Sequence, residues 1–186
     1  MRIMKEYGYM YALRLIKADY HRYSSLNKMG GAGKVKSFLK ILLLERGFRF
    51  TFWWRLAGVK SLFKPFFWLF YKHYFNKYGI QINASTQIGG GLYIGHGLGV
   101  VINPTAIIGK NFTISQFCTI GSNKEHAATI GDNVYIAPHC CIVEDVKIGD
   151  NSTIGAGSVV THDVPKNAIV AGVPAKIIKY LNSATL

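Results

Sequence analysis

The sequence predicts a parallel β-helix preceded by an α-helical N-terminal region, on the strength of two observations. From about residue 80 onward, aliphatic residues recur every six positions, whereas the first 78 residues follow no such period. Those 78 residues hold 20 of the 25 aromatic residues and 16 of the 22 Lys and Arg residues, against three acids. A chain of 186 residues is long enough for one domain with a smaller appendage.

The six-residue period indicates extended chain. Because six is a multiple of two, every repeat residue faces the same side of a strand, whereas a helix would distribute these residues around its axis. Glycine follows the aliphatic residue in many repeats, which suits a corner with positive φ. Three short strands and three corners make a coil of about 18 residues, so fourteen repeats predict four to five coils. The repeat residues are Ile82, Ile88, Ile94, Val100, Ile102, Ile108, Ile114, Ile120, Ile130, Ile136, Ile142, Ile148, Ile154 and Val160.

Three helices are predicted before the repeat, at residues 10–23, 34–46 and about 61–78. Their mixture of aromatic and basic side chains is typical of a segment in a membrane interface, where it would contact anionic lipid or a lipid-linked glycan. Packing of the aromatics on the end of the β-helix and on other copies is the alternative, and both interpretations stay open. The longest uncharged run, Pro65 to Tyr71, is too short to span a bilayer. No motif supports nucleic-acid binding.

We therefore expect a basic, aromatic helical region over residues 1–78, a β-helix over 79–165 and a C-terminal cap segment over 166–186. The start lacks the apolar core of a signal peptide. Three cysteines without metal-ligand spacing suit a reducing compartment. These features predict a cytoplasmic protein, with any membrane contact peripheral and at the cytosolic face.

The segments GIQINASTQIGGGLYIGHGLGVVIN, IGDNVYIAP and IGAGSVVTHDVPKNAIVAGVPAKII resemble the left-handed β-helix acyltransferases. The resemblance covers about residues 78–180. It is closest to the serine acetyltransferase-like branch, which includes sugar O-acetyltransferases of bacterial capsule and exopolysaccharide clusters. It implies a left-handed β-helix, acetyl-CoA as the donor, and a homotrimer with active sites between neighbouring β-helices.

His96 is the candidate general base, because the family's catalytic histidine falls on this residue. A neutral imidazole can take a proton from a hydroxyl, and a thioester needs no covalent nucleophile. One coil later the equivalent position is Gln116, so we expect the two side chains to be stacked neighbours. Serine acetyltransferases orient the histidine with an aspartate, where this chain has Gln81, and Gly95 replaces a second aspartate. Either Gln81 orients the imidazole through its carbonyl, or a backbone carbonyl or Glu125 of a neighbouring copy does.

The segment GSNKEHAAT is four residues longer than the repeat requires and carries Lys124, Glu125 and His126. Such an excursion leaves the coil and can reach the cleft of an adjacent copy. In serine acetyltransferases the corresponding region offers an Arg-His pair to the amino acid carboxylate. Glu125 is a poor partner for a carboxylate, which argues against serine as the acceptor. His126 either contacts the acceptor or is a solvated loop residue.

For the donor, the resemblance implies a CoA groove along the later coils, with Lys176 meeting a CoA phosphate. The small residues of that groove also suit corner geometry alone. We expect no metal site, because the histidines from His96 onward are no closer than 13 residues apart. Cys118 and Cys140 are expected to pack inward. The predicted groove consists of Ala137, Gly155, Ala156, Ser158 and Thr161.

Together these features predict transfer of acetyl from acetyl-CoA to a sugar hydroxyl of a bacterial surface polysaccharide or its lipid-linked precursor. Serine O-acetyl transfer in cysteine biosynthesis is the alternative activity. A non-catalytic, membrane-associated β-helix scaffold is the alternative of another class, which acetyl-CoA binding would distinguish.

Overall fold

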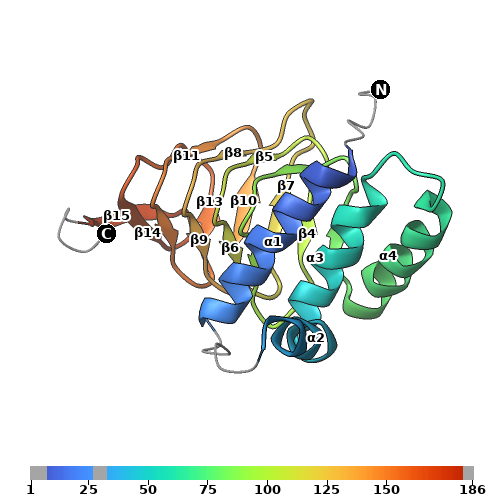
Figure 1. Cartoon of the computed structure of the whole chain (residues 1–186). Helices are drawn as coiled ribbons and strands as arrows, with labels where there is room; N and C mark the ends of the chain where they lie inside the picture. Colours follow the sequence, from blue (N-terminus) through green and yellow to red (C-terminus); the bar gives the residue numbers. More distant parts are fainter. Residues whose placement is uncertain (1–7, 27–32, 182–186) are drawn as a thin grey trace.

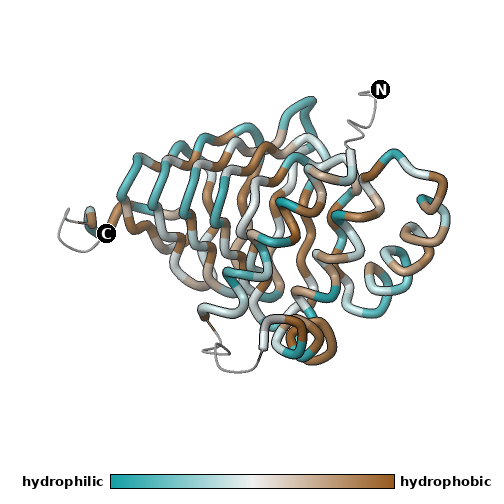
Figure 2. Tube along the Cα trace, viewed as in Figure 1, coloured by the Kyte–Doolittle hydropathy of each residue, from teal (hydrophilic) through white to brown (hydrophobic). Residues whose placement is uncertain are grey.

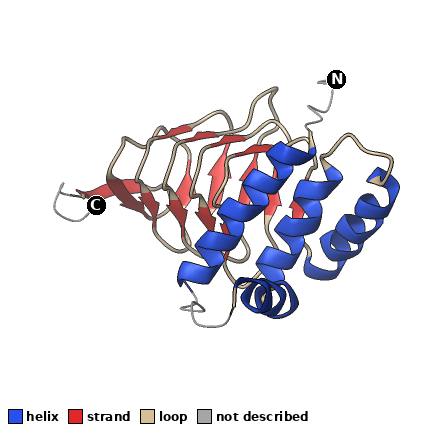
Figure 3. Ribbon diagram, viewed as in Figure 1, coloured by secondary structure: helices blue, strands red, loops and turns tan. Residues whose placement is uncertain are grey.

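A computed structural model describes residues 8–26 and 33–181, in which four helices precede a parallel β-helix (Figure 1). The predicted fold class is confirmed. The β-helix consists of stacked coils, and the helices lie beside its first coils (Figure 3). The helices are α1 (Tyr9–Leu26), α2 (Lys34–Leu44), α3 (Arg46–Ala57) and α4 (Lys64–Tyr78).

The strands form three sheets, here called sheets 1 to 3, and the chain passes through them in that order in each coil. All pairings are parallel except the last, between β14 and β15. Sheet 1 holds β1 (Gln81–Ile82), β4 (Val101–Ile102), β7 (Thr119–Gly121), β10 (Cys141–Val143) and β13 (Val159–Val160). Sheet 2 holds β2 (Gln87–Ile88), β5 (Ile107–Ile108), β8 (Thr129–Ile130) and β11 (Lys147–Ile148). Sheet 3 holds β3 (Tyr93–Ile94), β6 (Thr113–Ile114), β9 (Tyr135–Ile136), β12 (Thr153–Ile154), β14 (Ala168–Ala171) and β15 (Lys176–Tyr180).

The repeat aliphatics form the core of the β-helix, as predicted. All fourteen are buried, and in-register pairs such as Ile82 with Ile102 place every one except Val100 on its counterpart in the next coil. Figure 2 shows the resulting bands of hydrophobic residues along the coils. Because each strand contributes one inward side chain, strands of two residues suffice to build a continuous core.

Two coils are longer than the others. In sheet 1 the registers Gln81↔Val101, Val101↔Thr119, Thr119↔Cys141 and Cys141↔Val159 give spacings of 20, 18, 22 and 18 residues. Two extra residues lie between β3 and β4, in the segment that contains His96. Four extra residues lie between β7 and β8, and they form the loop that rises above the coils in Figure 1. The predicted excursion from the coil is therefore present.

Three of the four helices match the predicted ones, but the sequence did not predict α3. Its segment, RGFRFTFWWRLA, contains an early glycine and several aromatic residues of modest helix propensity. Burial explains the helix: Phe48, Phe50 and Trp54 are almost fully covered by the other helices and the first coil. Tertiary packing stabilises most protein helices more than propensity does.

The aromatic residues of the helical region divide into packed and exposed groups. Tyr23 and Tyr71 are buried, which agrees with packing on the β-helix. The turn before α4 and its first half, by contrast, expose a patch of large apolar side chains. None of the helices in residues 8–26 and 33–181 combines the length and apolar character needed to cross a bilayer. The patch consists of Leu62, Phe63, Phe66 and Leu69, which are 92, 64, 53 and 67 % exposed.

A buried ion pair joins the helical region to the first coil. Arg55 of α3 contacts the Asp19 carboxylate of α1 at 3.1 Å and donates to the backbone carbonyls of Ile88 and Gly89. Asp19 also accepts 2.8 Å hydrogen bonds from the amides of Gly91 and Leu92. Burial raises the pKa of the Asp19 carboxyl, and Arg55 and these amides oppose that rise by stabilising the carboxylate.

We predict that Arg55→Met lowers the free energy of unfolding by about 3–5 kcal/mol, because it leaves a buried carboxylate without its cation. Urea denaturation measures this loss. Arg14→Met, which removes an exposed cation from α1, is the matched control and should change stability little. Equal effects of the two substitutions would contradict a structural role for the pair.

Candidate functional site

The segments that join sheet 3 to sheet 1 form one edge of the β-helix, here called the His96 corner. It consists of residues 95–100, 115–118, 137–140 and 155–158, one segment in each coil. His96 lies in the segment with two extra residues, is exposed, and has a φ of 60°. The longer segment therefore carries its imidazole outside the coil, where a ligand can reach it.

Helices α1 and α3 contact the backbone of this segment. The Tyr23 hydroxyl donates to the Ile94 carbonyl at 3.3 Å and accepts from the Ile94 amide at 2.9 Å. Gly47 of α3 lies against the Ile94 carbonyl and the Tyr23 hydroxyl so closely that a Cβ there would collide with both. Gly97 faces it, because a Cβ on Gly97 would lie 2.6 Å from the Gly47 nitrogen. Two glycines thus permit the backbone of α3 to touch the segment that carries His96.

The structure corrects the predicted pairing of His96 with Gln116. The Phe117 amide donates to the Leu98 carbonyl at 3.2 Å, so the residue below Gln116 is Leu98. The two extra residues of this coil precede Val100, so a count of one full coil from His96 does not lead to its stacked neighbour. Val100 is stacked with the small, inward residues of the later coils.

Neither predicted partner orients the imidazole within one chain. In residues 8–26 and 33–181, the His96 side chain has no hydrogen-bond or ion-pair partner. Gln81 lies in β1, exposed, below Val101 of β4. Gln116 is half-buried on the His96 corner, and its side-chain carbonyl oxygen is buried without a partner among the described residues. A buried acceptor of this kind requires a donor from outside the chain.

Part of the predicted CoA groove lies on the same corner. The backbone stack Gly95, Ser115, Ala137 and Gly155 rises coil by coil through hydrogen bonds of 2.8–3.0 Å to the strand ends above. Ala156 is exposed beside it. Gly95, Ser115 and Ala137 are buried and Gly155 is half-buried, so within one chain the stack is open only at Gly155 and Ala156.

Ser158 corrects the groove prediction. It is fully buried, its hydroxyl donates to the Gly155 carbonyl inside the coil, and it accepts from the Gly172 amide at 3.2 Å. Its side chain therefore closes the corner from within. Lys176 is exposed on β15, at the far end of the coils.

Thr161 and the excursion lie on a different corner, between sheets 1 and 2. Thr161 is exposed, and its hydroxyl is 2.9 Å from the imidazole of His162. Lys124, Glu125 and His126 are exposed in the loop between β7 and β8. Within one chain, the strands of sheet 1 therefore lie between these residues and His96.

The two predicted inward cysteines fill the coil interior. Cys118 and Cys140 are buried in successive coils, and their thiols contact the carbonyls of Ala137 and Gly155. The hydrogen bond between the two thiols lowers the pKa of Cys140 to about 7 and raises the pKa of Cys118, as burial also does. Both are core residues.

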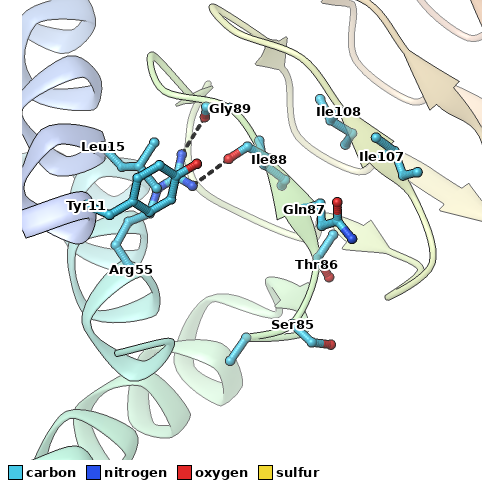
Figure 4. A pocket seen from close by; sticks show the side chains of 11 residues that line it. Tyr11, Leu15, Arg55, Ser85, Thr86, Gln87, Ile88, Gly89, Ile107 and Ile108 are labelled. Atoms are coloured by element: carbon cyan, nitrogen blue, oxygen red, sulfur yellow. Dashed lines mark hydrogen bonds between the residues drawn. The ribbon is translucent and has the colours of Figure 1, made fainter. Parts of the chain in front are cut away.

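Neither of two cavities in the described residues includes His96. The cavity in Figure 4, of about 460 Å³, lies between α1 and sheet 2. The guanidinium of Arg55 at this cavity already donates hydrogen bonds to the carbonyls of Ile88 and Gly89, which indicates that it stabilises the contact between α3 and the first coil. A second, open cavity lies along β8 and β11. In the described part of the chain, no three His, Cys, Asp or Glu side chains gather closely enough to hold a metal ion.

The β-helix is similar in sequence and structure to known acetyltransferases. Residues 127–162 match the family described as "Bacterial transferase hexapeptide (six repeats)". Over 105 residues the chain is 45 % identical to the serine acetyltransferase of Staphylococcus aureus and 40 % identical to that of Synechococcus elongatus. These matches cover 54 % of this chain and 49 and 43 % of the relatives, so the chain spans less than half the length of either.

Solved structures extend the likeness to the helices. The serine acetyltransferase of Brucella abortus superposes with a TM-score of 0.75 at 26 % identity, covering 91 % of this chain and 69 % of that one. The Neisseria gonorrhoeae serine acetyltransferase in complex with serine gives 0.74 at 28 % identity, covering 92 and 70 %. The chain resembles serine acetyltransferases in sequence and in fold. The Brucella abortus acetyltransferase has also been solved in complex with coenzyme A, and that structure gives the same TM-score and identity.

Sequence reasoning did not identify Tyr23, Gly47 or Phe117 as residues of the His96 corner. Tyr23 and Gly47 contact the His96 segment from α1 and α3, and no local sequence pattern relates a helix to a corner so distant in the chain. The sequence does carry a signal for Phe117: it occupies the position that glycine holds at 99 and 157, which indicates an unusual backbone conformation.

We predict that Gly47→Ala displaces α3 from the His96 segment and destabilises the protein by about 1–3 kcal/mol, as overpacking does. Thermal unfolding measures the loss. Gly33→Ala is the control, because a Cβ there meets no atom within 4 Å. If Gly47→Ala leaves the unfolding midpoint unchanged, the close contact between α3 and the corner is wrong.

Proposed function

We propose that this chain transfers acetyl from acetyl-CoA to a hydroxyl, with His96 as the general base. The exposed imidazole at the lengthened corner, in a β-helix similar to acetyltransferases, is the observation that carries the proposal. His96 takes the hydroxyl proton, and the oxygen attacks the thioester carbonyl. The tetrahedral intermediate then expels the CoA thiolate, which receives the proton from His96.

The half-buried Gly155 and the exposed Ala156 support a donor groove on the same corner. The unpaired amide oxygen of Gln116 supports a ligand there as well, because a bound substrate would supply the missing donor. Thr161, Lys176 and Gln81 stay candidate contacts, with Lys176 for a CoA phosphate.

Serine is the acceptor that the comparisons support, since the relatives are named for it. A saccharide hydroxyl is the second candidate. It is supported by Glu125, whose exposed carboxylate would repel the carboxylate of serine if the excursion reaches the acceptor.

We propose a homotrimer as the active assembly. The support is geometric: Lys124, Glu125 and His126 lie on another corner than His96, so a second copy must supply them to a shared site.

The exposed apolar patch before and within α4 supports peripheral contact with anionic lipid. Residues 33–78 hold ten Lys and Arg residues and one acid, Glu45, so the segment that carries the patch has a strong net positive charge. Apolar insertion and attraction to anionic headgroups reinforce one another at a membrane surface.

We predict that His96→Ala lowers acetyl transfer about 10²–10⁴-fold, the usual effect of removing a general base. Thiol release from acetyl-CoA, with serine and with polysaccharide fragments as separate acceptors, measures the rate. Acetyl-CoA affinity by calorimetry should persist. His21→Ala, an exposed histidine on α1, is the control. Turnover retained in His96→Ala would refute the base, and wild type that does not bind acetyl-CoA would favour a scaffold.

We predict that Leu69→Glu weakens sedimentation with vesicles that contain phosphatidylglycerol, and that raised salt weakens it further. Vesicles of phosphatidylcholine alone should bind less. Val173→Glu replaces a similarly exposed side chain at the opposite end of the β-helix and should have no effect. A loss of oligomer mass in Leu69→Glu, with vesicle binding unchanged, would assign the patch to contact between copies.

A further inference from the structure

Two bulky residues on the His96 corner adopt a backbone conformation that favours glycine. Gly79, Gly99 and Gly157 hold this left-handed position in their coils, with φ of 62°, 63° and 69°. In the two coils between, Phe117 and His139 hold it, with φ of 57° and 60°. A side chain in this conformation costs roughly 1–2 kcal/mol relative to glycine. Strain of this kind concentrates at functional sites.

The two side chains stack outside the coil. Their ring centroids are 5.1 Å apart and the rings are 28° from parallel. Phe117 is 48 % exposed, and His139 is also exposed. Neither ring covers the hydrophobic core, so core packing does not explain the strain.

The pair lies next to the segment that carries His96. The Phe117 ring lies across Gly99, because a Cβ on Gly99 would be 2.6 Å from the ring carbon Cδ1. On the other side of the pair the space beside Gly157 is open. Gln116, with its unpaired buried amide oxygen, directly precedes Phe117. An aromatic surface, an unsatisfied acceptor and the candidate base therefore share one corner.

We infer that the Phe117–His139 pair binds the ring of a saccharide acceptor and presents a hydroxyl to His96, which rests on the proposed acetyl transfer. One face of a pyranose ring consists of C–H groups with partial positive charge, which complement the negative face of an aromatic ring. Stacking also removes apolar surface of both partners from water. Serine has no ring and gains nothing from this surface. The pair determines specificity and takes no part in proton transfer.

Phe117→Gly tests the inference, because glycine suits the left-handed backbone and removes the ring without straining the coil. The KM for a saccharide acceptor should rise about tenfold, as expected for the loss of one stacking contact. The kcat, the KM for acetyl-CoA and the KM for serine should not change. The thermal unfolding midpoint should stay or rise. Tyr180→Ala removes an aromatic side chain of similar exposure, 54 % against 48 % for Phe117, on β15 at the far end of the coils, and is the matched control.

Unchanged saccharide kinetics in Phe117→Gly would overturn the inference. A rise in the KM for acetyl-CoA would also overturn it, since the pair would then belong to the donor. A measurement of sugar binding distinguishes a failure of this inference from a failure of the proposed acetyl transfer. The imidazole proton resonances of His139 should shift when methyl glucoside or N-acetylglucosamine is added to wild type or to His96→Ala. Absence of that shift overturns the inference even in a protein that transfers no acetyl group.

Discussion

The ion pair between Asp19 and Arg55 is the contact on which the placement of the helices depends. It joins α1, α3 and the corner at residues 88–92 through two carbonyls, two amides and the charges themselves. Removing either partner would leave an uncompensated charge in a buried place. The two helices therefore cannot shift on the first coil without losing several bonds at once. In consequence, the helical region and the start of the β-helix act as one rigid unit.

That rigidity reaches His96 through backbone contacts. Tyr23, one turn after Asp19 on α1, holds both polar groups of Ile94, and Gly47 of α3 touches Gly97. A two-residue insertion in a corner would otherwise be free to move, because neither extra residue belongs to a strand ladder. The helices thus supply to the lengthened segment the order that stacked coils give to the shorter ones. The position of the imidazole depends on elements more than forty residues away in sequence.

The sequence predicted the β-helix because a period of six has one structural solution for aliphatic side chains. Burial of all fourteen repeat residues follows from that period. Helix α3 could not be predicted in the same way, because its aromatic residues become helical through packing rather than propensity. The predicted stacking of His96 on Gln116 was wrong because Val100 has the aliphatic character of a repeat residue but occupies the position of the small inward residues. The alignment of Phe117 with Gly99 depends on the same placement of Val100, so the strained backbone of Phe117 was not predicted either.

The proposed homotrimer agrees with the arrangement of corners, because His96 and the excursion of one chain lie on different corners. His96 precedes β4 of sheet 1, whereas the excursion at residues 122–128 follows β7, the next strand of that sheet. Both are exposed, and neither the cavity between α1 and sheet 2 nor the one along β8 and β11 encloses either of them. An acetyl transfer site must exclude water from the tetrahedral intermediate. A corner that is open in one chain can do so when the excursion of another copy covers it. The four extra residues give the loop the length to leave its own coil, which the proposed homotrimer requires of it.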